Sequence, residues 1–452
     1  MEPPPAAEPS EQWRLLRVDG MQSIFSTSIA LFWLVVCLAP VLAAQDSTPP
    51  EPAREILTTE QAVAEAIAHN LDLLAARFDI DVAKAAVLTA RLRPNPELSL
   101  TADHLDILGA GFDLNNGAGP PEYASGVEYT IEGGGKRKQR TEAAGAAVPV
   151  AELQFLDAVR LTVLDVETAC VDALRARDDL ELARRNYAAQ QRIVEINTAR
   201  LAAGDIAELE LIRSRLEALS YQNDLRRAGL ALHSALVRVQ KLLGRPQPGA
   251  GFRIGGELRN DPHVPELSQV RRLALAQRPD LRALRHDLER AEAEISSQVA
   301  QGKIDFTVGA EYRRQQGING TGNSLGFSLG IPLPVFDRNQ GEIERARRER
   351  EQVRARIRAL VVAINSEVAG AYQELLTARD LFTAVQGKMV SEARDVLDIT
   401  QYSYERGDAS LLQLIDAQRA FNDTMLTYNE ARAAYARALY YLDAVSARRT
   451  KP

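Results

Sequence analysis

The residue types that most often do chemistry are scarce in this sequence, and their spacings do not combine them. The five histidines stand at positions 69, 104, 233, 263 and 286, so no two lie three or four residues apart on one helix face. Of the two cysteines, Cys37 falls in an N-terminal segment that we expect to be removed, which leaves Cys170 as the only thiol. Transition metals need several converging nitrogen or sulfur ligands, and no serine stands in a triad-like motif. The sequence therefore predicts no catalytic residue, no cofactor and no metal site.

One glycine-rich stretch, Gly133 to Lys138 (GGGKRK), could cradle a phosphate. Its spacing differs from that of a P-loop, and no serine or threonine follows Lys136. We prefer a structural interpretation. The glycines let a strand turn into a helix, and Lys136 and Arg137 lie at a membrane interface near lipid phosphates.

The composition argues against one class of partner. The chain has 452 residues, enough for two or three domains, with 46% hydrophobic and 25% charged residues. Its formal net charge is −7. Nucleic acid binding requires an excess of lysine and arginine, so no nucleic acid partner is expected.

The N-terminal region has the pattern of a targeting segment. Residues 1–44 are predicted to be a signal peptide, with basic residues, an apolar run from Ile29 to Leu42 and a small-residue cleavage site. A transmembrane anchor is the alternative, and Met21 is an alternative start. The neighbours of Cys37 fit a lipid-attachment motif poorly. Residues 45–57 read as a Pro-rich extended linker, and no later apolar run reaches the ~18 residues of a transmembrane helix.

Two segments, 96–132 and 304–334, alternate between apolar and polar residues with a period of two. In the second, Leu325, Phe327, Leu329 and Ile331 share one side, and Ser328 and Gly330 share the other. The loops, 109–121 and 315–323, are rich in turn-forming residues. Each segment predicts a β-hairpin with strands of about ten residues, the length that crosses a bilayer at a tilt. An ordinary soluble hairpin has the same pattern.

The rest of the chain predicts long helices. A helix is expected from Thr58 to Arg93, and longer ones on both sides of Gly204-Asp205, ending near Leu243. The stretch from 139 to 203 alone would be of the order of 90 Å long. Its narrow stripes of alanine and leucine between charged faces favour coiled-coil packing.

An internal repeat organises these elements. His69-Asn70-Leu71-Asp72-Leu73 returns as Gln277-Arg278-Pro279-Asp280-Leu281, at an offset of 208 (280 − 72), and Gly204-Asp205 returns as Gly407-Asp408. We therefore divide the chain into a first repeat, 58–264, a second repeat, 265–446, and a tail, 447–452. Each repeat is expected to contain a helix, a hairpin and a long helical hairpin that turns at Gly-Asp.

Four membrane-spanning strands cannot close a barrel, and an open edge in lipid leaves backbone groups unpaired. Two copies would give eight strands and a lumen filled by side chains, whereas three would give twelve and room for an aqueous pore. The side of the strands opposite the apolar one carries small, polar and acidic residues, which favour the pore.

At this point the chain resembles the TolC-like outer-membrane efflux proteins, over about residues 58–446. The resemblance rests on Thr130 to Arg137 (TIEGGGKR), on Ile331 to Gly341 (IPLPVFDRNQG) and on the two Gly-Asp turns. The first two elements are most similar to the heavy-metal-cation branch, the CzcC-like proteins. The resemblance implies an α plus transmembrane β fold: a homotrimer whose 12-stranded outer-membrane barrel, with four strands per chain, continues into a long periplasmic helical barrel. It also implies no enzymatic activity.

The resemblance further implies partners and site residues. The partners are outer-membrane lipid, a periplasmic adaptor and an inner-membrane pump of the RND type. Gly204, Asp205, Gly407 and Asp408 would form the periplasmic tips that dock the adaptor; a plain helix connection is the alternative. Alignment on Gly407 places the family's acidic aperture pair at Gln413 and Asp416, and only Asp416 keeps the charge. Glu210 would add a second ring or bond to a neighbouring helix. A solvated helix face is the alternative for Asp416.

The predicted function is that of an outer-membrane channel subunit of a tripartite efflux system, in a Gram-negative bacterium. It would passively conduct heavy-metal cations or drugs. A secreted or periplasmic coiled-coil scaffold or adhesin would explain the helices without the paired hairpins. A passive porin would explain the strands without the long helices.

Overall fold

The computed structural model describes residues 55–105, 107, 109, 121–246, 252–317 and 320–448. The predicted signal peptide lies outside these residues, as do most of the linker 45–57 and most of the tail. The elements of the first half are β1 (Glu55–Leu57), α1 (Thr59–His69), α2 (Leu71–Arg91), β2 (Glu97–Asp103), β3 (Glu122–Ile131), α3 (Lys136–Ala203) and α4 (Glu208–Leu242). Those of the second half are β4 (Phe252–Ile254), α5 (Leu267–Gln277), α6 (Pro279–Gln301), β5 (Phe306–Gly317), β6 (Gly320–Gly330), α7 (Gln340–Ala384), η1 (Val385–Met389), α8 (Val390–Arg406) and α9 (Leu411–Ser446).

The helix predicted from Thr58 to Arg93 is two helices. Thr58 caps α1 in a capping box with Gln61. At Asn70 the backbone is extended, and the Asn70 side chain caps α2 by accepting from the Leu73 amide at 3.0 Å. The Asn70 amide group also donates to the carbonyl of Leu242 at 2.8 Å, so it joins the start of α2 to the end of α4. An asparagine that caps one helix while it bonds another ends α1 without a proline or a glycine.

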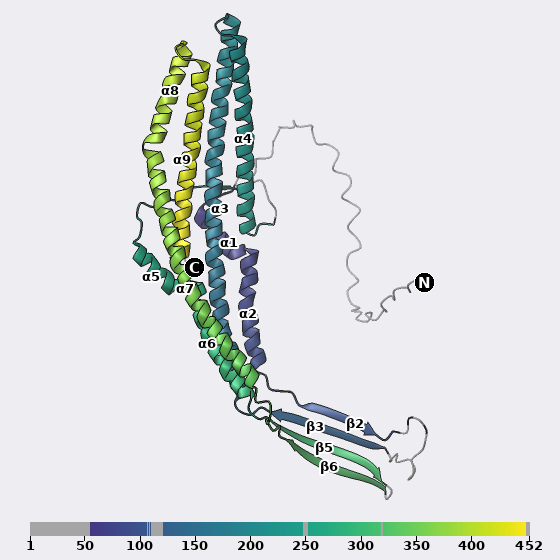
Figure 1. Cartoon of the computed structure of the whole chain (residues 1–452). Coiled ribbons are helices and arrows are strands. Elements are labelled where there is room, and N and C mark those ends of the chain that lie inside the picture. Colours follow the sequence, from purple (N-terminus) through teal and green to yellow (C-terminus); the bar gives the residue numbers. More distant parts are fainter. Residues whose placement is uncertain are drawn as a thin grey trace, which may run out of the picture. The chain divides into compact units, whose positions relative to one another are not determined.

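The helices stand side by side in a fixed order. The 68-residue helix α3 packs against α2 and α4 on one side and against α6 and α9 on the other. Helix α7 packs against α6 and α9, and α8 packs against α9. The order is therefore α2 and α4, then α3, then α6 and α9, then α7 and α8 (Figure 1). Helices α2 and α4 form one edge, and α7 and α8 form the other.

The two halves repeat the same break. Asn70 separates α1 from α2, and Arg278, 208 positions later (278 − 70), separates α5 from α6. Arg278 is buried, and it pairs with Asp280 at 2.7 Å and with Glu367 at 2.5 Å. These two carboxylates raise the pKa of the Arg278 guanidinium, although burial alone would lower it. The repeated position thus separates two consecutive helices in both halves. The Asn70 side chain is held there by an amide hydrogen bond, and the Arg278 side chain is held by ion pairs.

Both predicted hairpins form, and they join into one antiparallel sheet in the order β2-β3-β5-β6. The join is the pairing of β3 with β5, from Ile131 opposite Phe306 to Glu122 opposite Gln315. The expected loop 315–323 was too long, because β5 and β6 stay paired as far as Gly317 opposite Gly320. The apolar strand face was predicted to include Ile331, but strand β6 ends one residue earlier, at Gly330. There the chain approaches Pro332, which has no amide to donate.

A second, small sheet was not predicted. Strand β1, in the segment expected to be a linker, pairs in parallel with β4, between Glu55 opposite Phe252 and Leu57 opposite Ile254. A three-residue strand is too short for alternation to reveal it.

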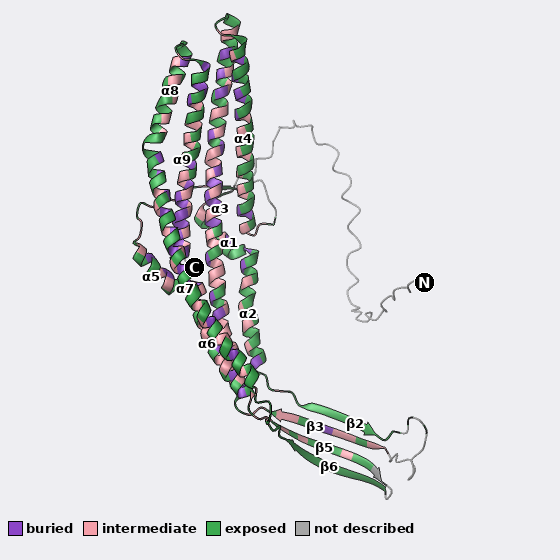
Figure 2. Ribbon diagram, in the orientation of Figure 1, coloured by how far each residue is buried: buried purple, intermediate pink, exposed green. Residues whose placement is uncertain are grey.

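The apolar core lies among the helices. One cluster joins α1, α3 and α9, and includes Val166, Leu174 and Tyr440; a second joins α5, α7 and α9, and includes Ile364 and Leu375. The four-stranded sheet has no such core, and Figure 2 shows β2 and β6 exposed along their whole length. In the part of the chain that the structure describes, no helix is both long enough and apolar enough to span a membrane.

Candidate functional site

The four-stranded sheet has one apolar and one polar face, and the strand register keeps each face continuous. Across the strands, Leu98 lies opposite Val127, Val127 opposite Ala310, and Ala310 opposite Phe327. The apolar side chains are nevertheless exposed: Leu100 is 76% exposed and Phe327 is 81% exposed. A whole apolar sheet face that meets no other described element of the chain requires an apolar environment outside it.

The opposite face is acidic. In the described strands it carries one guanidinium, that of Arg313, which bonds Glu122 at 3.1 Å and Glu311 at 3.0 Å. Within the described strands, five carboxylates share this face: Glu97, Asp103, Glu122, Glu128 and Glu311. A surface of this composition suits an aqueous passage that favours cations.

The sheet also has two open edges. Among the described strands, β2 pairs only with β3, and β6 pairs only with β5. Each edge strand therefore presents a row of unpaired backbone groups, which in a membrane must find partners in another chain.

The glycine-rich loop ties the two hairpins together. Gly134 and Gly135 have φ angles of +64° and +76°, and a side chain at Gly133 would collide with the carbonyl of Ile304. The Gly133 amide donates to Asp305 Oδ1 at 2.9 Å, and Lys136 Nζ donates to Asp305 Oδ2 at 2.7 Å. The predicted strand-to-helix turn is confirmed.

The role expected for Lys136 at the membrane interface needs correction. Lys136 is buried, with 6% of its surface exposed, and its ammonium group is held by Asp305 rather than presented to lipid phosphates. Partial burial by itself would raise the pKa of Asp305, but the bonds from Lys136 and the Gly133 amide hold that pKa below its ordinary value. Arg137, the next residue, is exposed.

The two Gly-Asp turns are alike. Gly204 and Gly407 have φ angles of +84° and +87° and end α3 and α8. The amide of Asp205 returns to the carbonyl of Arg200 at 2.9 Å, and that of Asp408 returns to Ser403 at 2.9 Å. All four turn residues are exposed.

Neither aspartate caps the helix that follows. The backbone amide of each aspartate bonds to the end of the preceding helix, and the next helix begins further along the chain. Ala207 precedes α4 without a side-chain cap. Ser410 caps α9 in a capping box with Gln413, whose Oε1 accepts from the Ser410 amide at 2.8 Å.

The three residues assigned to the aperture therefore have different surroundings in the structure. Gln413 is a member of this capping box, so its amide group serves the start of its own helix. Asp416 is exposed, one turn into α9. Glu210 is half-buried in the first turn of α4, and its carboxylate has no hydrogen bond or ion pair within the described ranges.

The sequence reasoning missed the residues that join the tips. Tyr404, on α8, donates its hydroxyl to Asn197 on α3 at 2.5 Å, in a buried position. Arg200 donates to the carbonyls of Tyr404 at 3.2 Å and Glu405 at 2.7 Å. Burial, together with the nearby Glu210, raises the pKa of Tyr404. The sequence carried one signal for this contact: Gln190 and Asn197 are two buried amides at heptad spacing in an apolar stripe.

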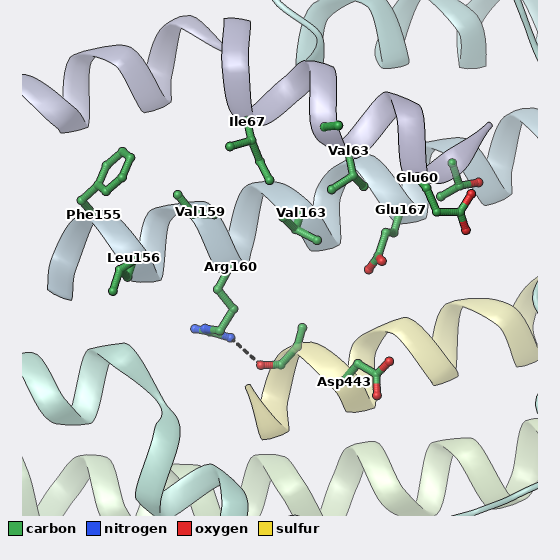
Figure 3. Close-up of a pocket in the computed structure, with 13 residues that line it drawn as sticks. Glu60, Val63, Ile67, Phe155, Leu156, Val159, Arg160, Val163, Glu167 and Asp443 are labelled. Carbon is green, nitrogen blue, oxygen red and sulfur yellow. Dashed lines mark hydrogen bonds between the residues drawn. The ribbon is translucent and has the colours of Figure 1, made fainter. Parts of the chain in front are cut away.

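A separate apolar cavity of about 370 Å³ lies between α1, α3 and the end of α9 (Figure 3). Val63, Ile67 and Phe155 supply part of its apolar wall. Two of its charged groups are engaged: Arg160 donates to the carbonyl of Ala444 at 3.2 Å, and Asp443 accepts from Arg259 at 2.8 Å.

Neither a metal cluster nor a reactive thiol is found in the described part of the chain. No three histidine, cysteine, aspartate or glutamate side chains are grouped to hold an ion there. Cys170 is buried, and burial raises the pKa of its thiol to about 12. A thiol with such a pKa stays protonated and unreactive at neutral pH.

A four-stranded sheet with a lipid-suited face and an acidic face, joined to long paired helices, defines a TolC-like channel fold. The chain belongs to the outer membrane efflux protein family, whose sequence profile matches residues 62–245 and 270–448. It is therefore an outer-membrane efflux channel protein whose large helical part lies in the periplasm, and the family is one of channels, not of enzymes.

Known relatives agree with this assignment. The chain is 25% identical to the cobalt-zinc-cadmium resistance protein CzcC of Cupriavidus metallidurans over 384 residues, 84% of this chain and 87% of that protein. It is 24% identical to the pyoverdine export outer membrane protein OpmQ of Pseudomonas putida over 388 residues, 78% of this chain and 77% of that protein. Its fold is similar to the solved structure of CusC, with a TM-score of 0.70 and 19% identity over 87% of this chain and 93% of that one.

Proposed function

We propose that three copies of this chain assemble into a channel for heavy-metal cations. The observation that carries this proposal is the four-stranded sheet, with its two open edges, exposed apolar face and acidic face. Joining β2 of one copy to β6 of the next closes a 12-stranded barrel, with the apolar face in lipid and the acidic face in the lumen.

The helices support the same closure. In the row of helices, α2 with α4 forms one edge and α7 with α8 forms the other. In the sheet, β2 and β6 form the two edges in the same order. A ring of three copies therefore pairs sheet edges and helix edges at once. The two repeats, 58–264 and 265–446, would supply alternate sectors of one continuous wall.

The exposed turns suit a docking role. Gly204, Asp205, Gly407 and Asp408 lie at the ends of the helices farthest from the sheet, and the tie between Arg200 and Tyr404 keeps the two turns adjacent. We assign these tips to a periplasmic adaptor that links the channel to an inner-membrane RND pump. Asp416 would line the closed end of the passage, and Arg137 would lie at the membrane interface.

The charge of the lumen favours cationic cargo. Five carboxylates against one guanidinium in the described strands of each chain would give fifteen against three in the assembled barrel (3 × 5 and 3 × 1). Such a lining concentrates cations without binding them in a fixed ligand set, which suits passive conduction. The energy for export would come from the pump.

The test is metal susceptibility in a strain that lacks the gene. We expect greater sensitivity to Co²⁺, Zn²⁺ and Cd²⁺, restored by the wild-type gene. Drug sensitivity without metal sensitivity would contradict the cargo, and no change in either would contradict efflux.

A further inference from the structure

The apolar cavity of about 370 Å³ between α1, α3 and the end of α9 has no part in the channel proposed above. Its volume falls within the range of pockets that hold small ligands. The apolar side chains of its wall are half-buried or exposed, because they face the cavity rather than another helix. They are Val63, Ile67, Phe155, Leu156, Val159 and Val163. A bound molecule would remove this apolar surface from water.

Each of two helices contributes one face to the cavity. On α1 the face runs from Glu60 through Val63 to Ile67, at spacings of three and four residues. On α3 it runs from Phe155 to Glu167 in steps of four. Each face thus has a glutamate at one end and a large apolar side chain at the other.

The two glutamates lie at the same end of the cavity, and Phe155 lies at the opposite end (Figure 3). Glu60 is exposed, and Glu167 is buried, with 4% of its surface exposed. Burial raises the pKa of the Cys170 thiol to about 12, and the charges of Glu167 and Glu60 contribute to this rise. Both carboxylates therefore stand near one thiol, which agrees with their place at one end of the cavity.

The basic groups around the cavity leave this end acidic. Among the described lining residues the one cation is Arg160, which already pairs with Asp157 at 2.8 Å. A third lining carboxylate, Asp443, accepts from Arg259 at 2.8 Å. Glu60 adds a negative charge that no lysine or arginine of the described ranges pairs. The cavity therefore favours a ligand with an apolar body and a positively charged head.

The two ends of the mature chain do not have this composition. Residues 45–54 (QDSTPPEPAR) contain two carboxylates and one guanidinium, and they contain no large apolar side chain. Residues 449–452 (RTKP) contain two cations and again no large apolar side chain. The first segment has the wrong net charge for the acidic end, and the second has nothing to cover the apolar wall. A separate molecule fits the cavity better than either segment.

We propose that the cavity binds a small amphipathic cation. Its apolar body lies against Ile67 and Phe155. Its ammonium group lies at the end formed by Glu60 and Glu167. The cavity is built within one chain, so this site does not depend on the assembly of three copies. A ligand there contacts α1 and α3 together and stabilises the folded chain, because any molecule that binds only the folded state does so.

Two probes of similar size test the site: 4-phenylbutylamine and its neutral analogue 4-phenylbutanol. The amine is protonated at pH 7, as a lysine side chain is. Each probe is titrated by calorimetry into the full chain in detergent micelles, with empty micelles as the blank. We expect one molecule of the amine per chain. The amine should bind about tenfold more tightly than the alcohol, a difference of about 1.4 kcal/mol.

Three variants locate the bound probe. Val163→Phe fills the cavity, so it should abolish binding of the amine while the melting temperature of the unliganded protein stays the same or rises. Glu60→Gln removes a charge from the acidic end, so the affinity for the amine should fall close to that for the alcohol. Glu152→Gln makes the same change on α3 at an exposed residue outside the cavity, and it should leave the affinity for the amine unchanged.

The opposite results would overturn the proposal. Equal affinity for the two probes would overturn the cationic head, and binding of the amine that survives Val163→Phe would overturn the cavity as its site. No measurable binding of the amine would overturn the ligand site itself. Binding that appears only after deletion of residues 45–54 would assign the cavity to that segment instead. None of these results would contradict the proposed channel, which the metal susceptibility of the deletion strain tests separately.

Discussion

The strand faces predict how an arginine is tolerated in β6. Leu325 lies at the middle of this strand, on the apolar face, opposite Tyr312. In the assembled barrel, Leu325→Arg would put a guanidinium near the centre of the lipid, at a cost of about 2–4 kcal/mol per chain. Leu329 is on the same face but one residue from the end of the strand, so Leu329→Arg should cost only about 0–1 kcal/mol. If the costs of three copies add, the Leu325→Arg trimer loses about 6–12 kcal/mol.

The matched control is Gly326→Arg, on the neighbouring residue. Gly326 lies on the acidic face opposite Glu311, and a side chain there would meet only the Glu311 carbonyl, at 4.0 Å from the new Cβ. The guanidinium would reach water and a carboxylate, so trimers should persist. The assay is the fraction of trimer on native gels across a urea titration. Equal loss of trimer from Leu325→Arg and Gly326→Arg would refute the assignment of the two faces.

Three other outcomes follow from the structure. Replacing Gly204 and Gly407 by valine forces a branched side chain into the left-handed region, at about 1–2 kcal/mol per site, and should abolish efflux while trimers persist; full efflux would contradict docking at the tips. Lys136→Met should destabilise the trimer by about 1–3 kcal/mol in thermal unfolding, because Asp305 loses its partner. Asp305→Asn should destabilise the trimer less at low pH than at neutral pH. The folded-state pKa of Asp305 is lowered, so its contribution is full above its ordinary value near 4 and is lost as the pH falls through the lowered value. Asp416→Ala should raise conductance or weaken cation preference in planar bilayers at low salt, and unchanged currents would remove Asp416 from the aperture.

The sequence predicts the large elements because their signals extend over many residues. Alternation over ten residues revealed both hairpins, and the Gly-Asp repeat located both tips. Short or local features gave no such signal. Strands β1 and β4 have three residues each, and the break at Asn70 depends on a bond to Leu242, which is distant in the sequence.

The candidate site was predictable in kind but not in detail. Residue type placed Lys136 near phosphates, whereas its burial against Asp305 depends on how the two hairpins meet. Gln413 matched an aperture position by alignment, yet Ser410 three residues earlier makes it half of a capping box. The spacing Ser410-x-x-Gln413 was readable in the sequence and would have predicted the capping box. The place of Gln413 at the aperture stays a prediction.

The central claim is that three copies close one channel, and the most direct test is the mass of the complex released from detergent micelles. We expect three chains and no stable smaller species, because each copy alone exposes two open sheet edges and an apolar face. A monomer that remains in solution without detergent would contradict it.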